Sequence, residues 1–181
     1  MKFLCGPHSA GKTELSKALN KDNYNCIELG KLVREIHTDL KVDANFHDWS
    51  VDVEKEHGPE YIDALILEKL KRNLVNTDET SIIKTIIVGA RSLEIINRIK
   101  KSGIGPNNHL VVYIESTFEQ LKERYIKRDG KEISDQKFRH LLRNDKTLGL
   151  SDIRENADII IQNRGTLQEF LNKATSIITK N

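Results

Sequence analysis

The stretch that decides the fold is residues 1–19, MKFLCGPHSAGKTELSKAL. A short strand-like run, KFLC, leads into a glycine-bearing turn, and a helical pattern follows directly. The turn carries the spacing G-x-x-x-x-G-K-T at Gly6, Gly11, Lys12 and Thr13. A strand that enters a helix through such a turn points several backbone N–H groups and the positive end of the helix dipole at one spot. The sequence therefore predicts a phosphate-binding loop.

The residue types in this loop indicate a nucleotide with a metal ion. Lys12 would reach the β and γ phosphates, and the Thr13 hydroxyl would ligate Mg²⁺. We expect ATP and Mg²⁺ as the ligands, with the nucleotide held by Gly6, His8, Ser9, Ala10, Gly11, Lys12, Thr13 and Glu14. His8 is open to two interpretations, because a loop histidine either contacts a substrate or lies exposed without a role.

Composition limits the classes of protein that fit. The chain has 181 residues, enough for one domain, and 29 Lys plus Arg against 27 Asp plus Glu give a net charge of +2. Such a balance argues against bulk affinity for nucleic acid or membranes. No apolar run approaches a signal peptide or the ~18 residues of a membrane span, so we expect a cytoplasmic protein. Cys5 and Cys26 lie in apolar runs and are expected to be free thiols.

Apolar runs rich in β-branched residues alternate with helical patterns along the rest of the chain. The predicted strands cover residues 2–5, 24–29, 81–88, 109–114 and 157–162. Helical spacing is found at 12–19, 31–40, 59–74, 92–103 and 167–178. Strands separated by helices cannot pair as hairpins, so the pattern predicts an α/β fold with a mainly parallel sheet and helices on both faces. Capping boxes are expected at Ser116 with Glu119 and at Thr166 with Glu169.

Arginines follow several of the predicted strands. The set comprises Arg34, Arg91, Arg124, Arg128, Arg139 and Arg143. Parallel sheets bind ligands at the carboxyl ends of their strands, and phosphoryl transfer between two anionic substrates needs cations around the transferred group. The guanine-reading N-K-x-D on a later strand and the D-x-x-G switch of regulatory GTPases are missing. The pattern therefore favours a small kinase over a G protein.

At this point the residues resemble a known group. GPHSAGKT, IELGKLVRE, IIVGARSLEIINRIKK, VVYIESTFEQLKERYIKR, LLRNDKTLGLSDI and ADIIIQNRGTLQEFLNKA look like successive blocks of the nucleoside-monophosphate-kinase-like P-loop kinases. The match is strongest with uncharacterised, mostly archaeal proteins related to adenylate kinase and dephospho-CoA kinase. The resemblance implies one three-layer P-loop NTPase domain over 1–181, with a five-stranded parallel sheet in the order 2-3-1-4-5. It also implies a helical acceptor-binding segment at 38–75 and a short lid at 128–143.

The same resemblance implies roles for individual residues. Arg34 would hold the phosphate of the acceptor, and Arg91 would do the same or bridge both substrates. Arg124 and Arg128 would grip the donor phosphates at the base of the lid, and Arg143 would close over them. The turn from Asn163 to Gly165 would flank the base of the donor. The resemblance thus implies a nucleotide donor and a small phosphorylated acceptor as partners, and it leaves the oligomeric state open.

Two carboxylates that relatives commonly carry are absent. Gly30 and Lys31 stand where relatives have G-D, and Val88 and Gly89 stand where they have D-G. Glu28 is the best replacement in the sequence, and Glu60 and Asp63 are more remote candidates. Lys31 would itself pair with a phosphate, which changes this position from a metal to an anion contact.

Further alternatives stay open at this level. Phe46 and Trp49 either stack on a nucleobase or anchor a loop on the core. The six histidines show no zinc-ligand spacing. The first hypothesis is a Mg·ATP-dependent kinase, the second is a nucleotide-binding regulator or weak ATPase that has lost transfer, and the third is an ATPase acting on nucleic acid.

Overall fold

The computed structural model describes residues 1–58, 60–105 and 108–180. Pro59 and Pro106, which the sequence pattern places at turns, lie outside the described residues. Within the described part of the chain, five parallel strands form one sheet in the order β2-β3-β1-β4-β5. The strands are β1 (Lys2–Cys5), β2 (Asn25–Glu28), β3 (Thr85–Val88), β4 (Leu110–Glu115) and β5 (Ile159–Gln162). The expected fold class and strand order are confirmed.

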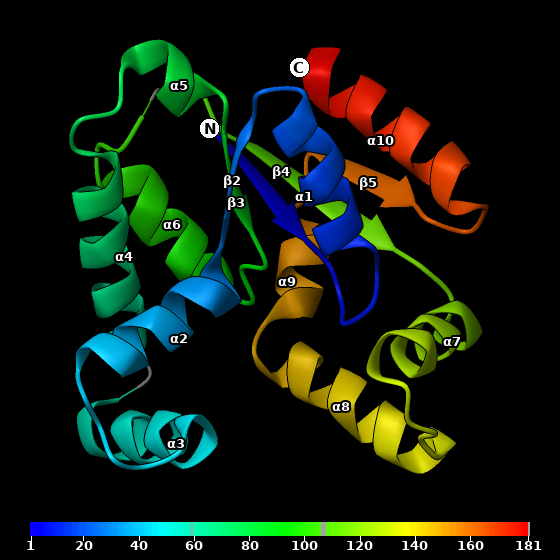
Figure 1. Ribbon diagram of the computed structural model, residues 1–181, viewed down its shortest axis with the longest axis horizontal. Helices are drawn as coiled ribbons and strands as arrows, with labels where there is room; N and C mark the ends of the chain where they lie inside the picture. Colours follow the sequence, from blue (N-terminus) through cyan, green and yellow to red (C-terminus); the bar gives the residue numbers. More distant parts are fainter. Residues whose placement is uncertain (59, 106–107, 181) are drawn as a thin grey trace.

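Helices cover both faces of the sheet, as Figure 1 shows. They are α1 (Lys12–Lys21), α2 (Leu29–Asp39), α3 (Phe46–His57), α4 (Glu60–Leu74), α5 (Glu79–Ile83), α6 (Leu93–Lys101), α7 (Phe118–Asp129), α8 (Asp135–Thr147), α9 (Leu150–Glu155) and α10 (Leu167–Lys180). Strand side chains alternate between the two faces. Phe3 and Cys5 join the hydrophobic cluster that includes α2, α4, α6 and α9, whereas Leu4 joins the one with α1, α7, α8 and α10. Both cysteines are free thiols.

The predicted strand at 81–88 is wrong in its first half. The Asp78 carboxylate accepts a hydrogen bond from the Ser81 backbone N–H at 3.0 Å and caps the short helix α5. Ile82 and Ile83 therefore belong to a helix, and β3 begins only at Thr85. A local cap at Asp78 outweighs the strand preference of the isoleucines that follow it.

One predicted capping box is displaced by one residue. Thr117, not Ser116, caps α7, and its partner in the box is Gln120 rather than Glu119. The Ser116 hydroxyl instead donates to the carbonyl oxygen of Asn163 at 2.6 Å. The second box is confirmed, because Thr166 and Glu169 exchange hydrogen bonds at the start of α10.

The segment between β2 and β3 is largely helical. It contains α3, which the sequence did not predict, and α4, which packs on both α2 and α3. Trp49 is buried with 4% exposure and lies against His37, with ring centroids 5.0 Å apart, and against Phe46 at 6.0 Å. The two aromatic side chains therefore anchor α3 on the core. In the described residues, no helix combines the length and the apolar character needed to cross a membrane.

Candidate active site

The predicted phosphate-binding loop joins β1 to α1 at the carboxyl edge of the sheet, on the same side as α3, α7 and α8 (Figure 1). Gly6 has φ 142°, and a Cβ there would lie 2.5 Å from the carbonyl oxygen of Ile114. Gly11 has φ 104°, and a Cβ would lie 2.7 Å from Nδ2 of Asn163. Residues other than glycine are excluded at both ends of the loop for two reasons. The backbone angles there are unfavourable for any residue with a Cβ, and the added Cβ would collide with β4 or with the residue after β5.

Lys12 is folded back over the loop that it closes. Its Nζ donates to the carbonyl oxygens of Gly6 at 2.7 Å and Pro7 at 2.8 Å. Burial lowers the pKa of the ammonium from 10.5 to about 8; Asp145 raises it in part, while Arg91 and Arg128 lower it further. The loop thus holds a buried cation that an anionic ligand would stabilise.

The loop also fits a phosphate at Ser9. The Ser9 hydroxyl oxygen is buried and has no hydrogen-bond partner within the described residues, and the backbone has a φ of 61°. A buried hydroxyl without a partner costs about 1–3 kcal/mol, so a phosphate oxygen in the loop would satisfy it. Thr13 lies exposed in the first turn of α1, where its hydroxyl is accessible to a metal ion. The Glu14 carboxylate is bonded to Lys17 at 2.7 Å.

Asp145 is the site residue that sequence reasoning missed. It lies on α8, is 3% exposed, and its Oδ2 accepts from the His8 backbone N–H at 3.0 Å. The same oxygen is 2.7 Å from His8 Nδ1, and Oδ1 is 3.8 Å from Nη1 of Arg91. Burial by itself raises the pKa of Asp145, but the His8 hydrogen bonds and the charge of Arg91 outweigh it, so the pKa lies below its usual value.

A pattern in the sequence was available to find this carboxylate. Phe138 and Asp145 are the buried residues of α8, with Leu141 and Leu142 half-buried between them. Positions i, i+3, i+4 and i+7 share one helix face, so a carboxylate occupies a place in an otherwise apolar stripe. A buried charge is retained only when it has partners, and that condition points to a cation or a histidine opposite α8.

Arg91 completes the group formed by His8, Lys12 and Asp145. It lies in the turn between β3 and α6, and its Nη2 is 3.3 Å from Nε2 of His8. The structure therefore brings together residues from the first strand turn, the third strand turn and α8. We call His8, Lys12, Arg91 and Asp145 the loop cluster.

Arg124 and Asn163 connect α7 and the turn after β5 to the phosphate-binding loop. Arg124 donates to the Ser116 hydroxyl at 2.9 Å and to the backbone oxygen of Asn163 at 3.1 Å. The Asn163 side-chain amide donates in turn to the Ala10 carbonyl oxygen at 2.8 Å. Gly165 follows close by, and a Cβ there would lie 2.6 Å from a Glu169 carboxylate oxygen. The predicted base-flanking turn is thus fixed to the loop through Asn163.

The predicted lid contains the end of α7, a short loop and α8. Arg128 donates to Asp129 at 2.6 Å and lies 5.2 Å from the ring centroid of Tyr125. Arg139 lies over Phe118 at 4.1 Å, and Arg143 is exposed on α8. Of these arginines, Arg128 has a charge that acts on Lys12.

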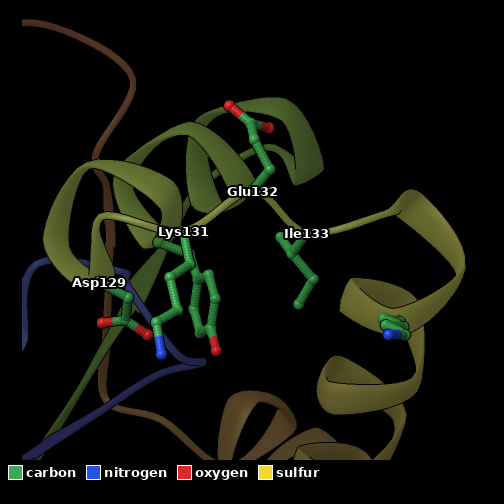
Figure 2. Close-up of a pocket in the computed structure, with 6 residues that line it drawn as sticks. Asp129, Lys131, Glu132 and Ile133 are labelled. Atoms are coloured by element: carbon green, nitrogen blue, oxygen red, sulfur yellow. The ribbon is translucent and has the colours of Figure 1, made fainter.

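A hollow of about 570 Å³ lies beside this part of the lid. Its lining comprises Tyr125, Asp129, Lys131, Glu132, Ile133 and Lys137. In Figure 2 the side chain of Ile133 points into the hollow, whereas Glu132 points away from it. The hollow is bordered by Asp129, whose carboxylate is held by Arg128.

Of the residues predicted for the acceptor, Arg91 belongs to the loop cluster, and the other three lie on and before α2. Arg34 is exposed, and its side chain lies back over the start of α2: a Cβ added to Gly30 would be 3.9 Å from Nη1 of Arg34. Lys31 is 73% exposed at the side chain and is 3.9 Å from Glu35. Glu28 ends β2 beside Val88 and occupies the N-cap position of α2, where its side chain makes no capping hydrogen bond. In the described contacts these three side chains do not touch the loop cluster.

Comparison with known proteins supports the fold and gives distant relatives. No protein-family model matches the chain. It is similar to a UPF0200 protein of Sulfurisphaera tokodaii, at 25% identity over 98% of this chain and 94% of that protein. A UPF0200 protein of Pyrococcus abyssi is 28% identical over 98% of this chain and 95% of its own length. The resemblance to archaeal proteins is therefore confirmed.

Two solved structures have the same architecture. A gluconokinase from Sinorhizobium meliloti has a TM-score of 0.64 and 15% identity, covering 99% of this chain and 91% of that one. A shikimate kinase from Aquifex aeolicus has a TM-score of 0.55 and 16% identity, covering 100% and 98%. At this identity the likeness defines the fold, which is the α/β fold of P-loop kinases.

Proposed function

We propose that the protein is a Mg·ATP-dependent kinase that transfers the γ-phosphoryl group to a nucleotide or a related phosphorylated metabolite. One observation carries the proposal. Lys12 Nζ lies 2.7 Å from the Gly6 carbonyl oxygen, and Nη2 of Arg91, from the turn after β3, lies 3.3 Å from His8 Nε2 in the same loop. The charges of Arg91 and Arg128 also lower the pKa of Lys12. Cations gathered at a phosphate-binding loop are expected where the charge of a transferring phosphoryl group must be neutralised.

Each part of the site has a place in this reaction. The loop amides and Lys12 would bind the donor phosphates, and the Ser9 hydroxyl would donate to one of their oxygens. Thr13 would hold Mg²⁺, which supplies charge neutralisation between the phosphates when bound. Arg91 and Arg128 would balance the charge that spreads over the transferred group, with Arg143 approaching from α8.

The acceptor would bind on the α2 side of the loop. Arg34 and Lys31 are exposed cations there. Among the described residues no ion pair of Arg34 is found, and the ion pair of Lys31 with Glu35 is long, at 3.9 Å. Exposed cations of this kind are available to hold an anionic group of the acceptor. The proposal is supported by the two solved structures with this fold, which are a gluconokinase and a shikimate kinase.

The test is a transfer assay with a matched pair of lysine variants. Purified protein is incubated with γ-labelled ATP, Mg²⁺ and a panel of nucleoside monophosphates, deoxynucleoside monophosphates and dephospho-CoA. Label in an acceptor is expected with the wild type and with Lys21→Ala, an exposed lysine at the far end of α1. Lys12→Ala is expected to abolish it.

A second candidate function follows from the missing carboxylates after β2 and β3. A nucleotide-binding regulator would need the loop and its cations but no transfer. It predicts ATP binding that depends on Lys12, with no labelled acceptor and with ATP turnover equal in the wild type and Lys12→Ala. A Lys12-dependent product from any acceptor contradicts this candidate.

A further inference from the structure

His8 is held in one orientation and in one proton arrangement. Its Nε2 lies 3.3 Å from Nη2 of Arg91, and a guanidinium has only donors to offer. Nε2 therefore accepts this hydrogen bond and carries the lone pair. The proton of the neutral ring must then be on Nδ1, which donates to Asp145 Oδ2 at 2.7 Å. The two contacts together select the neutral Nδ1–H tautomer.

Asp145 is built to keep this arrangement. Its carboxylate is 3% exposed, and its pKa is lowered despite burial because of His8 and Arg91. Oδ2 accepts from both the backbone and the ring of His8, which fixes the histidine at two points.

A histidine with its Nδ1–H on a buried carboxylate and a lone pair on Nε2 has the arrangement of a general base. The carboxylate orients the ring and stabilises the imidazolium that forms when Nε2 takes up a proton. In the described part of the chain, His8 is the histidine in the phosphate-binding loop, and Arg91 is the group that covers its lone pair.

We infer that His8 is the general base that takes the proton of the acceptor, with Asp145 as its positioning residue, and that the acceptor atom is therefore an alcohol oxygen. This inference rests on the proposed kinase function, and it narrows the acceptor from any nucleotide or phosphorylated metabolite to one that is phosphorylated on a hydroxyl group. A phosphate monoester loses its second proton with a pKa of about 6, so a phosphate acceptor is already a nucleophile at neutral pH. An alcohol acceptor must lose a proton during transfer, and the loop cluster holds a base for it.

The step balances with the groups already named. The hydroxyl oxygen of the acceptor forms a bond to the γ-phosphorus of ATP. The bond from that phosphorus to the oxygen bridging the β and γ phosphates breaks, and its electron pair leaves with ADP. The hydroxyl proton moves to Nε2 of His8 and later to water. For this to occur Arg91 must leave Nε2, and an anionic group of the bound substrates would draw it away.

The charged groups that face His8 come from three elements. Asp145 on α8 contacts the ring and Arg91 lies in the turn after β3, while the charge of His8 acts on Asp129 at the end of α7. The His8→Gln side chain keeps an amide that can donate to Asp145 and an oxygen that can accept from Arg91, but it has no ring nitrogen to take up the acceptor proton.

The first experiment identifies the bond that is formed. Wild-type protein is incubated with ATP, Mg²⁺ and, separately, nucleoside monophosphates, nucleosides, sugar phosphates and dephospho-CoA, and the products are read by ³¹P NMR. A new phosphate monoester is expected. A phosphoanhydride, as in a nucleoside diphosphate, overturns the inference and leaves the kinase function standing. No Lys12-dependent product from any acceptor overturns the kinase function and the inference with it.

The second experiment separates the base from a structural contact. His8→Gln is expected to lower kcat about 100-fold with little change in KM for ATP. His109→Gln, which lies just before β4 at the amino end of the sheet, should keep both constants. A His8→Gln variant that keeps the wild-type kcat, or that loses activity only through KM for ATP, contradicts the assignment.

A third measurement tests Asp145 without using activity. In the wild type, ¹⁵N-resolved NMR of the imidazole should show a single Nδ1–H tautomer for His8. Asp145→Asn should give a mixture of tautomers and a lower kcat, whereas Asp22→Asn, exposed at the far end of α1, should change neither. An unaltered His8 tautomer in Asp145→Asn would show that the carboxylate does not position the ring.

Discussion

The side-chain amide of Asn163 donates a buried hydrogen bond to the carbonyl oxygen of Ala10, 153 residues away along the chain. The bond joins the turn after β5 to the middle of the phosphate-binding loop. Arg124 holds the other side of Asn163 through its backbone and side-chain oxygens. The loop is therefore shaped by the last strand of the sheet as well as by its own glycines.

Replacing this amide should weaken both stability and nucleotide binding. Asn163→Ala leaves the Ala10 carbonyl buried without a partner, which is expected to cost about 1–3 kcal/mol in the free energy of unfolding. Urea denaturation measures this loss, and calorimetry with ATP should show weaker binding. Asn172→Ala, which removes an exposed pair with Gln168 on α10, should change stability by less than about 0.5 kcal/mol.

Two glycines with positive φ should respond differently to alanine. Gly130→Ala at the end of α7 has φ 65° and open space around its Cβ, so it should cost about 1–2 kcal/mol from backbone strain. Gly11→Ala adds a collision with Asn163 and a contact with Phe170 at 3.0 Å. Gly11→Ala should therefore lower the free energy of unfolding more than Gly130→Ala does, and it should also abolish ATP binding. Equal effects of the two variants would contradict the packing described for the loop.

Lys12 should make the free energy of unfolding rise with pH in the alkaline range. Its pKa in the folded protein is about 8, below the 10.5 of an ordinary lysine, so the unfolded chain binds more protons between these values. This group therefore makes unfolding less favourable as pH rises from about 8 to 10.5. This increase in the free energy of unfolding should be absent in Lys12→Met. Saturating ATP should reduce the increase in the wild type, because the phosphates stabilise the charged ammonium of Lys12. Guanidinium titrations at several pH values measure both effects.

Asp63 should make stability depend on pH in the acidic range, and in the opposite direction to Lys12. Burial raises its pKa from 3.8 to about 6, although the charge of Arg98 opposes this. The folded protein then binds more protons than the unfolded chain between about pH 4 and 6, so this contribution to stability falls as pH rises through that window.

Asp63→Asn tests this assignment directly. The variant should be more stable than the wild type at pH 7 and equal to it below pH 4. Asp22→Asn, an exposed carboxyl remote from α4, should show no such difference. A gain that persists at pH 3 would assign the effect to packing rather than to charge.

The strands and the phosphate-binding loop could be predicted because their signals are local. β1 was predicted with its bounds, and the loop spacing lies at the strand-to-helix junction that the structure contains. Ile82 and Ile83 misled the prediction, since the cap at Asp78 fixes them as helix. The exposed polar pattern of α3 hid a helix whose stability comes from Trp49 against the core.

The loop cluster could be predicted only in part, because its members come from separate elements and do not follow from local signals. Lys12 and Arg91 follow strands, so their meeting at the sheet edge follows from topology. Asp145 reaches His8 because α8 packs on α7, through Phe138 against Phe118 and Tyr125, and because the chain turns at Gly149 after the helix. The apolar stripe of α8 marks Asp145 as a carboxylate that needs a partner, but the identity of that partner depends on how separate elements pack.

The bond from the His8 backbone amide to Asp145 gives the loop a built-in reporter. Amide protons that donate to a buried acceptor exchange with solvent only when the bond opens. Deuterium uptake at His8 would therefore be slow while α8 is docked and fast once it swings away. One amide can thus follow the docking of α8 without a label.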